Sequence, residues 1–296
     1  MSYDFDFQRY VDRQRSPHGT RSENTDEFGD YAFSGDLRVL RRLDRMKPVR
    51  VVAESTVRFW KSVQKNQLLG KCVKISRRQF PELYDITAEC ARTLDIPMPA
   101  VYVMQNPAEL DSGTYGTHDE AFIILNAYLI DRFEEQELKF IVGHECGRLQ
   151  NNHVVYHTAV SYLSQGVSSY IKWAATPASL ALNGWARRGE ITCDRAGLVC
   201  CGDEEAAINT MLKLAIGSKK LFEQMDLDEY LKQIDGIKEG IGRFSEYFDA
   251  HPYLPKRIEA LKLFANSRYF RSQIGLDGGD PLDEIDRKVE EIIQVF

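Results

Sequence analysis

The sequence predicts an α+β protein that is mostly helical and contains one small β-sheet. Apolar residues recur at helical spacing along most of the 296-residue chain, and an apolar content of 43% is enough to bury a sizeable core. Three short stretches between residues 71 and 126 instead show strand patterns. A long helical segment follows them and carries His144 next to Glu145. The expected order is therefore helices, a small sheet, and then a helix with a polar pair at its centre.

The first half of the chain contains a polar arm, three helices and the three strands. Residues 1–33 are rich in charged and small polar residues and poor in aliphatic ones, so we expect a mobile charged arm. Leu37, Leu40 and Leu43 recur at helical spacing directly after it. The expected elements are helices over 37–46, 48–67 and 81–94, strands over 71–76, 100–104 and 121–126, and a turn-rich stretch over 111–118.

The second half of the chain is helical throughout. A central helix over 134–152 is followed by 154–185, which predicts a helical hairpin, with a membrane-surface contact as the alternative. The further expected helices cover 187–200, 203–214, 227–248, 256–265 and a last amphipathic helix with Pro281 at its N1 position and Ile285, Val289, Ile292 and Phe296 on one face. We expect three regions: the arm over 1–33, a main domain over 34–275, and a linker with the amphipathic helix over 276–296.

Charge and composition exclude some classes of function. A net charge of −6 gives no reason to expect a nucleic-acid partner. No run of about 18 to 20 apolar residues predicts a membrane span. The six cysteines form no C-x-x-C pair, and the N-terminus lacks the basic start and apolar run of a secretory signal. These features predict a cytoplasmic protein with reduced thiols.

The stretch Ile141-Val-Gly-His144-Glu145-Cys-Gly-Arg148 carries the chemistry. In the H-E-x-x-H pattern of zinc peptidases, two histidines at i and i+4 bind the metal and the glutamate activates a water. His144 and Glu145 match, but Arg148 stands at the i+4 position. A guanidinium has no lone pair to donate and stays protonated, so it does not bind zinc.

The segment from about residue 79 to 257 resembles the gluzincin metallopeptidases of the CAAX-prenyl-protease and heat-shock membrane-protease type (metallopeptidase family forty-eight), and looks like their soluble bacterial branch. The matching motifs are Gln79-Phe-Pro-Glu-Leu-Tyr84, Val101-Tyr-Val103, Glu137-Leu-Lys-Phe-Ile-Val-Gly-His-Glu145, Asn151-Asn-His153, Glu190-Ile-Thr-Cys-Asp-Arg-Ala-Gly197 and His251-Pro followed by Arg257. The resemblance implies a zincin-like fold in which a short sheet roofs the metal helix. It also implies a zinc ion and a peptide or protein substrate.

The resemblance assigns roles to several residues. His144 and Glu190 would be metal ligands, and Glu145 the general base that takes a proton from metal-bound water. Asp194, four residues after Glu190, lies on the same helical face and would orient His144. His251 would donate to the oxyanion of the tetrahedral intermediate, and Arg257 would support it. A structural role for His251 is the alternative. Without a metal, the alternative for Glu145 is an ion pair with Arg148.

A strand near residues 112–115 falls where the family has an Asn-Ala-Phe edge that pairs with the substrate backbone. The chain has Ser-Gly-Thr-Tyr at this place. By this match Thr114 and Tyr115 are the candidate substrate-binding residues.

Arg148 weakens any zinc site here. At an effective dielectric constant of about 20, two unit charges ~4 Å apart interact with roughly 4 kcal/mol, and a dication doubles this repulsion. His153 and His157 lie about 180° and 220° around an unbroken helix from His144, so neither replaces the missing ligand. We expect Arg148 to form charge-assisted bonds with Glu190 or Glu145 instead.

Two functions follow from these residues. The first is a zinc-dependent endopeptidase by family, impaired or inactive because of Arg148. The alternative is a non-catalytic pseudopeptidase that binds peptides or proteins, with self-association through the C-terminal helix. Arg148 is either native or a replacement of an ancestral histidine, and the sequence alone does not separate these origins.

Overall fold

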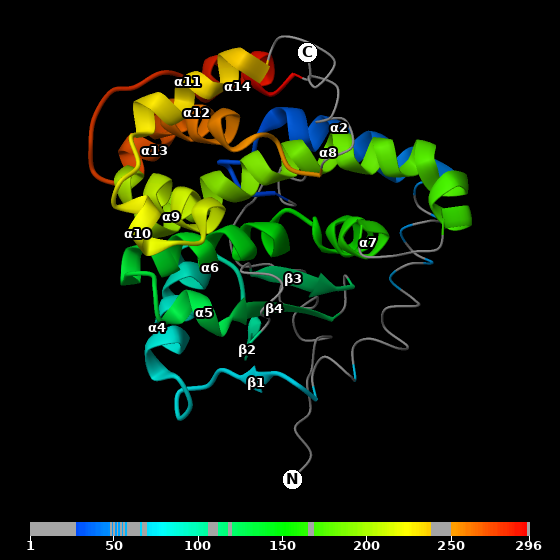
Figure 1. The fold of residues 1–296 in the computed structure, drawn as a ribbon, viewed down its shortest axis with the longest axis horizontal. Coiled ribbons are helices and arrows are strands. Elements are labelled where there is room, and N and C mark those ends of the chain that lie inside the picture. The colour runs from blue at the N-terminus through cyan, green and yellow to red at the C-terminus, as the bar shows by residue number, and fades with distance from the viewer. Residues whose placement is uncertain are drawn as a thin grey trace, which may run out of the picture.

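The computed structural model describes residues 28–47, 49, 51, 53, 55, 57, 66, 70–105, 112–117, 120–164, 169–237 and 250–294. It confirms an α+β fold that is mostly helical, with one small mixed sheet. The helices α6 (Glu135–Gln150), α7 (Val154–Ser164) and α8 (Ser169–Cys201) separate the sheet from a second helical layer (Figure 1). That second layer contains α2 (Ser34–Arg45), α12 (Leu254–Ala265) and α14 (Leu282–Ile293).

The sheet has the strand order β1-β2-β4-β3. The strands are β1 (Val73–Lys74), β2 (Ala100–Met104), β3 (Gly113–Gly116) and β4 (Ala121–Asn126). β2 and β4 run parallel, while β1 and β3 pair antiparallel at the two edges. The expected strand over 71–76 is thus reduced to two residues, and the stretch expected to be turn-rich contains β3. Side chains of β4 alternate between the two faces of the sheet. Ile123 and Leu125 pack in the main core with residues of α6, and Phe122 and Ile124 pack in a smaller cluster on the other face.

The N-terminal boundary of the fold lies earlier than expected. Tyr31 and Phe33 are buried, and Phe33 packs with residues of α12 and α14. Residues 28–33 therefore belong to the folded body rather than to a mobile arm, because two aromatic side chains supply apolar surface to the core. The rest of the predicted arm, 1–27, lies outside the described residues. In the predicted helix over 48–67, the structure describes only residues 49, 51, 53, 55, 57 and 66, and each of these is helical.

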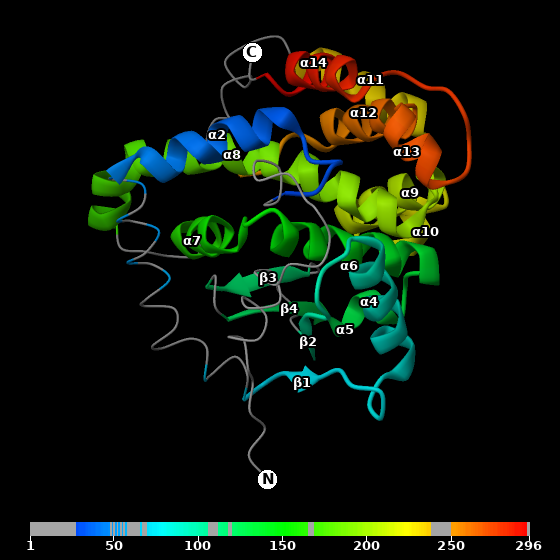
Figure 2. The same cartoon turned by 180° about the vertical axis from the view of Figure 1, so that it is seen from behind.

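α2 runs along α8, as both Figure 1 and Figure 2 show. α8 is one continuous helix of 33 residues, which corrects the expected break between a hairpin ending at 185 and a helix starting at 187. Pro177 interrupts the apolar pattern of the sequence, but the helix continues through it, and its second half packs between α6 and α2. Among the described residues, no helix is both long and apolar enough to cross a bilayer.

The remaining helices complete the layers: α4 (Pro81–Thr93), α5 (Ala127–Ile130), α9 (Glu204–Ile216), α10 (Lys219–Phe222), α11 (Leu227–Ile237) and α13 (Arg268–Gln273). The short helices α5, α10 and α13 were not expected from the sequence. The predicted helix over 227–248 is present as α11, and its part beyond residue 237 lies outside the described residues.

The C-terminal helix α14 packs on the body of the protein. Ile285, Val289 and Ile293 are buried together with Phe33 and Ala260. The apolar face on which we based the expectation of self-association is therefore occupied within the chain. Pro281 precedes the helix as its N-cap instead of standing at N1, a difference of one position.

Candidate active site

Close packing of α6 on α8 places the candidate residues together. A Cβ atom on Gly143 would lie 2.5 Å from the Cβ of Cys200, and one on Gly147 would lie 2.5 Å from the Cβ of Ala196. Only glycine allows the two helix backbones to come this close. As a result, His144 and Arg148, one turn apart on α6, face two carboxylates one turn apart on α8.

We call six residues from three helices the site cluster: His144, Glu145, Arg148, Glu190, Asp194 and Arg257. Arg148 lies at its centre with only 5% of its surface exposed. Its Nη2 atom donates to Oε1 of Glu190 at 2.6 Å, and its Nε atom lies 3.3 Å from Oε2 of Glu145. The expected ion pairs of Arg148 with these two carboxylates are confirmed.

The same Nη2 atom lies 2.9 Å from Nε2 of His144. Because a guanidinium only donates hydrogen bonds, Nε2 accepts and the imidazole proton resides on Nδ1. Nδ1 in turn donates a hydrogen bond to Oδ1 of Asp194 at 3.1 Å. His144 thus has the tautomer and the carboxylate support that metal-binding histidines have, with an arginine nitrogen 2.9 Å from Nε2.

Asp194 and Arg257 form a bidentate pair behind His144. Nε of Arg257 donates to Oδ2 at 2.9 Å, and Nη2 donates to Oδ1 at 2.7 Å. Although burial raises the pKa of Asp194, the Arg257 charge and its hydrogen bonds hold this pKa below its usual range. Arg257, expected to support His251, contacts Asp194 and also lies 3.3 Å from Oε2 of Glu190.

Glu190 is buried and surrounded by cations. Burial alone raises the pKa of its carboxyl, but the Arg148 charge, followed by His251 and Arg257, holds this pKa well below its usual range. His251 approaches from the loop before α12, with Nε2 3.7 Å from Oε1 of Glu190 and 56% of its side chain exposed. The structure therefore brings His251 to the open side of the site cluster.

Glu145 is held by the sheet. Ser112 donates to its Oε1 at 2.9 Å, and Thr114 donates to its Oε2 at 2.6 Å. The Thr114 side chain is 0% exposed, and its hydroxyl is bonded to Glu145. Tyr115 belongs to the apolar cluster on the other face of the sheet. The sequence analysis did not identify Ser112 as a hydrogen-bond donor to Glu145. The two residues are distant in the sequence, so no spacing pattern indicates that they meet.

β3 is an edge strand of the sheet, and α7 lies against its outer edge. The carbonyl oxygen of Thr114 accepts from Nδ1 of His157 at 3.1 Å, and the amide of Gly116 donates to Oγ1 of Thr158 at 3.2 Å. Burial, followed by the Arg148 charge, holds the pKa of His157 well below its usual range, so this histidine stays neutral. Two polar groups of the edge that a peptide would use are therefore occupied.

The residues present do not fit a zinc ion. Nε2 of His144 and Oε1 of Glu190 both contact the same Arg148 nitrogen, which fills the position a cation would need to reach them. A structural or catalytic zinc site requires at least three protein ligands, and Arg148 supplies none. Within the described part of the chain, no group of three or more His, Cys, Asp or Glu side chains is arranged to hold a metal ion.

A histidine and a glutamate on one helix face a glutamate and an aspartate on a second helix under a small sheet, an arrangement that agrees with a gluzincin-type fold. Residues 77–265 match Peptidase family M48. The match covers more than half of the chain, and the chain belongs to this family.

Individual relatives are similar over shorter stretches. The plastoglobule-localized metallopeptidase 48 of Arabidopsis thaliana, a chloroplastic protein, is 30% identical over 168 residues, or 56% of this chain and 49% of the relative. A protease HtpX homolog of Streptococcus pneumoniae is 23% identical over 231 residues, covering 64% of this chain and 75% of the relative. A protease HtpX homolog of Tropheryma whipplei is 23% identical over 228 residues, covering 67% of this chain and 78% of the relative. The chain thus spans about half the length of the chloroplast relative.

Proposed function

We propose that this chain has the framework of a zinc-dependent endopeptidase and that Arg148 holds it in a form without zinc-dependent activity. The single observation that carries the proposal is the Nη2 atom of Arg148, which contacts both candidate metal ligands at 2.9 and 2.6 Å. Membership of the metallopeptidase family supports the first half of the proposal, and the donor set supports the second.

The remaining parts of a peptidase site are retained around this arginine. Asp194 keeps His144 in the tautomer that exposes the Nε2 lone pair, and two hydroxyl groups fix the Glu145 carboxylate. His251 stands at the open side, where it would donate to an oxyanion. One substitution, Arg148→His, would therefore complete the H-E-x-x-H pattern without any other change.

A cleavage assay tests this proposal. Unfolded casein with a quenched fluorophore is incubated with the chain, with Arg148→His and with Arg148→His/Glu145→Gln, each with added zinc. We expect cleavage by Arg148→His alone, because the double variant lacks the general base. Chelator-sensitive cleavage by the unchanged chain would contradict the proposal.

The non-catalytic alternative, a protein that binds peptides through the edge of β3, has less support. His157 and Thr158 of α7 already bond to that edge, so a peptide would have to displace them. Binding of unfolded casein by the unchanged chain, strengthened in His157→Ala, would favour this alternative. Equal and negligible binding by both forms would exclude it.

A further inference from the structure

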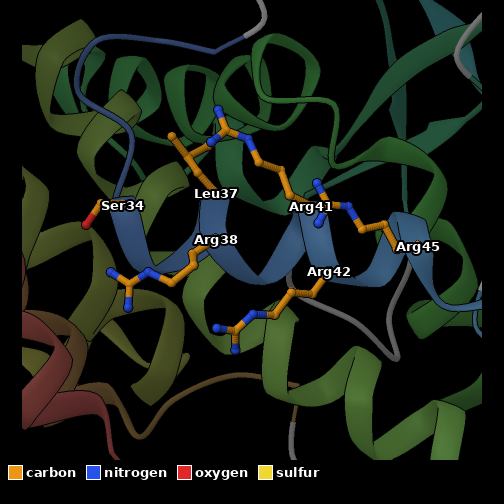
Figure 3. Close-up of a pocket in the computed structure, with 6 residues that line it drawn as sticks. All are labelled: Ser34, Leu37, Arg38, Arg41, Arg42 and Arg45. Carbon is orange, nitrogen blue, oxygen red and sulfur yellow. The ribbon is translucent and has the colours of Figure 1, made fainter.

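A basic face lies on α2, away from the site cluster. It consists of Arg38, Arg41, Arg42 and Arg45, which follow each other at helical positions i, i+3, i+4 and i+7. All four side chains are exposed, and with Ser34 and Leu37 they line an open groove of about 390 Å³. Figure 3 shows the four guanidinium groups extending from this one stretch of the helix.

The basic face is separate from the face that α2 uses for folding. Leu40 and Leu43 lie on the opposite side of the helix and are buried with Leu182 and Trp185 of α8. The arginines therefore contribute nothing to the core. Like charges at these spacings destabilise a helix, which makes such a stripe costly unless a partner neutralises it.

The four arginines have no acidic partner among the residues that the structure describes. Arg41 lies over the ring of Phe28 at 5.9 Å, a contact that leaves its guanidinium available to an anion. The nearby carboxylate of Asp44 accepts a hydrogen bond from the Tyr156 hydroxyl at 2.6 Å and is turned to α7. The face thus presents positive charge on a chain whose net charge is −6.

Exposed apolar residues occur just after the basic face in the chain and on the helix that packs against α2. Met46 directly follows the basic face and is 43% exposed, Val51 is 58% exposed, and Leu180 of the neighbouring α8 is 38% exposed. Arginines that pair with phosphate, together with exposed apolar side chains, are the combination that a membrane surface with anionic lipids recognises. Nucleic acid would use the charge but not the apolar residues.

We propose that the basic face of α2 docks the protein onto anionic phospholipid headgroups. The proposal concerns attachment to a surface, since α2 buries its own apolar side in the protein.

Vesicle co-sedimentation of the full chain tests this. Phosphatidylcholine vesicles with and without phosphatidylserine are compared at low and high salt. We expect binding only with phosphatidylserine, loss of binding at high salt, and at least a ~10-fold weaker partition for Arg38→Gln/Arg41→Gln/Arg42→Gln/Arg45→Gln, because each basic residue contributes near an anionic surface. The matched control is Arg78→Gln/Arg92→Gln/Lys219→Gln/Lys220→Gln, which removes the same charge from exposed positions elsewhere.

Three results would overturn the proposal: no sedimentation of the unchanged chain, equal loss in both variants, or competition by inorganic phosphate at matched ionic strength, which would indicate a free-phosphate site. Circular dichroism of both variants checks that they are folded. A second variant, Met46→Ser/Val51→Ser, is expected to weaken the partition by a few-fold, since it removes apolar contact but no charge. Unchanged partition of this variant would contradict the apolar part of the proposal.

Discussion

Two buried histidines in this molecule pair with aspartates, yet their surroundings differ. His144 pairs with Asp194 in the site cluster, and His153 pairs with Asp36, whose Oδ2 lies 2.9 Å from Nε2 of the histidine. We call Asp36, His153, Trp185 and Thr192 the Asp36 cluster. Its carboxylate also accepts from the Trp185 indole at 2.8 Å and the Thr192 hydroxyl at 2.6 Å.

The difference lies in how the carboxylates are satisfied. In the Asp36 cluster, the one carboxylate accepts hydrogen bonds from two neutral donors of α8, the Trp185 indole and the Thr192 hydroxyl, and lies beside the ring of His153. The site cluster gathers Glu145, Glu190 and Asp194 and depends on two guanidinium groups to hold them together. The three carboxylates of the site cluster therefore need positive charge beside them, which a guanidinium or another cation could supply. The Asp36 cluster has no such need.

The largest effect is expected from Arg148→Met, which removes the central cation and leaves Glu190 buried. Breaking a buried ion pair by removing one partner typically costs about 3–5 kcal/mol. Urea denaturation should show a loss of this size in the free energy of unfolding. Arg92→Met, at an exposed position on α4, is the control and should change little. A loss below about 1 kcal/mol for Arg148→Met would mean that Arg257 alone satisfies the cluster.

The Asp36 cluster should respond more weakly to Asp36→Asn. An amide keeps the shape but replaces one acceptor oxygen by a donor, and an unsatisfied buried group costs about 1–3 kcal/mol. The same denaturation measurement, repeated with added zinc, should give the same loss, because this cluster offers no cation position. Zinc-dependent recovery of Asp36→Asn would remove the contrast between the clusters. Asp131→Asn, at an exposed position directly after α5, serves as control.

A smaller effect is expected from Thr114→Val. The substitution keeps the volume and removes the hydroxyl that donates to Glu145, and a hydrogen bond to a charged group contributes about 1.5–3 kcal/mol. The lower end applies because Ser112 still donates to the same carboxylate. Thr93→Val, at an exposed position at the end of α4, controls for the loss of a hydroxyl. Equal stability of the two variants would indicate that Glu145 does not depend on the sheet.

The mildest perturbation is acid. Glu190 and Asp194 have pKa values below their ordinary values of 4.5 and 3.8, so their contribution to stability is complete above those values. It is lost as the pH falls below them toward the folded-state pKa values. The melting temperature should therefore be level from neutral pH to about pH 5 and fall below about pH 4. In Arg148→Met this acid loss should be shallower, and an identical pH profile in both proteins would contradict the assignment to Arg148.

The sequence predicted the part of the site that depends on helical spacing and charge. His144 and Arg148 share one face of α6, Glu190 and Asp194 share one face of α8, and the opposite charges of Arg148 and Glu190 made their contact predictable. The match of residues 77–265 to the family agrees with the motifs that carried the resemblance.

Contacts between distant elements were not predictable in the same way. Ser112 reaches Glu145, and His157 and Thr158 reach β3, only because the sheet, α6 and α7 meet in space. The positions of His153 and His157 were judged on an unbroken helix, whereas α6 ends at Gln150 and α7 is a separate helix. Tyr31 and Phe33 follow a polar stretch, and its composition led us to assign them to a mobile arm although both side chains are buried.

The central claim is that Arg148 occupies the position of the metal. Zinc content by elemental analysis, on the unchanged chain and on Arg148→His after equilibration with zinc, tests it most directly. We predict about one zinc per chain for Arg148→His, as three protein ligands provide, and none for the unchanged chain. One equivalent of zinc in the unchanged chain, or none in Arg148→His, would contradict the account.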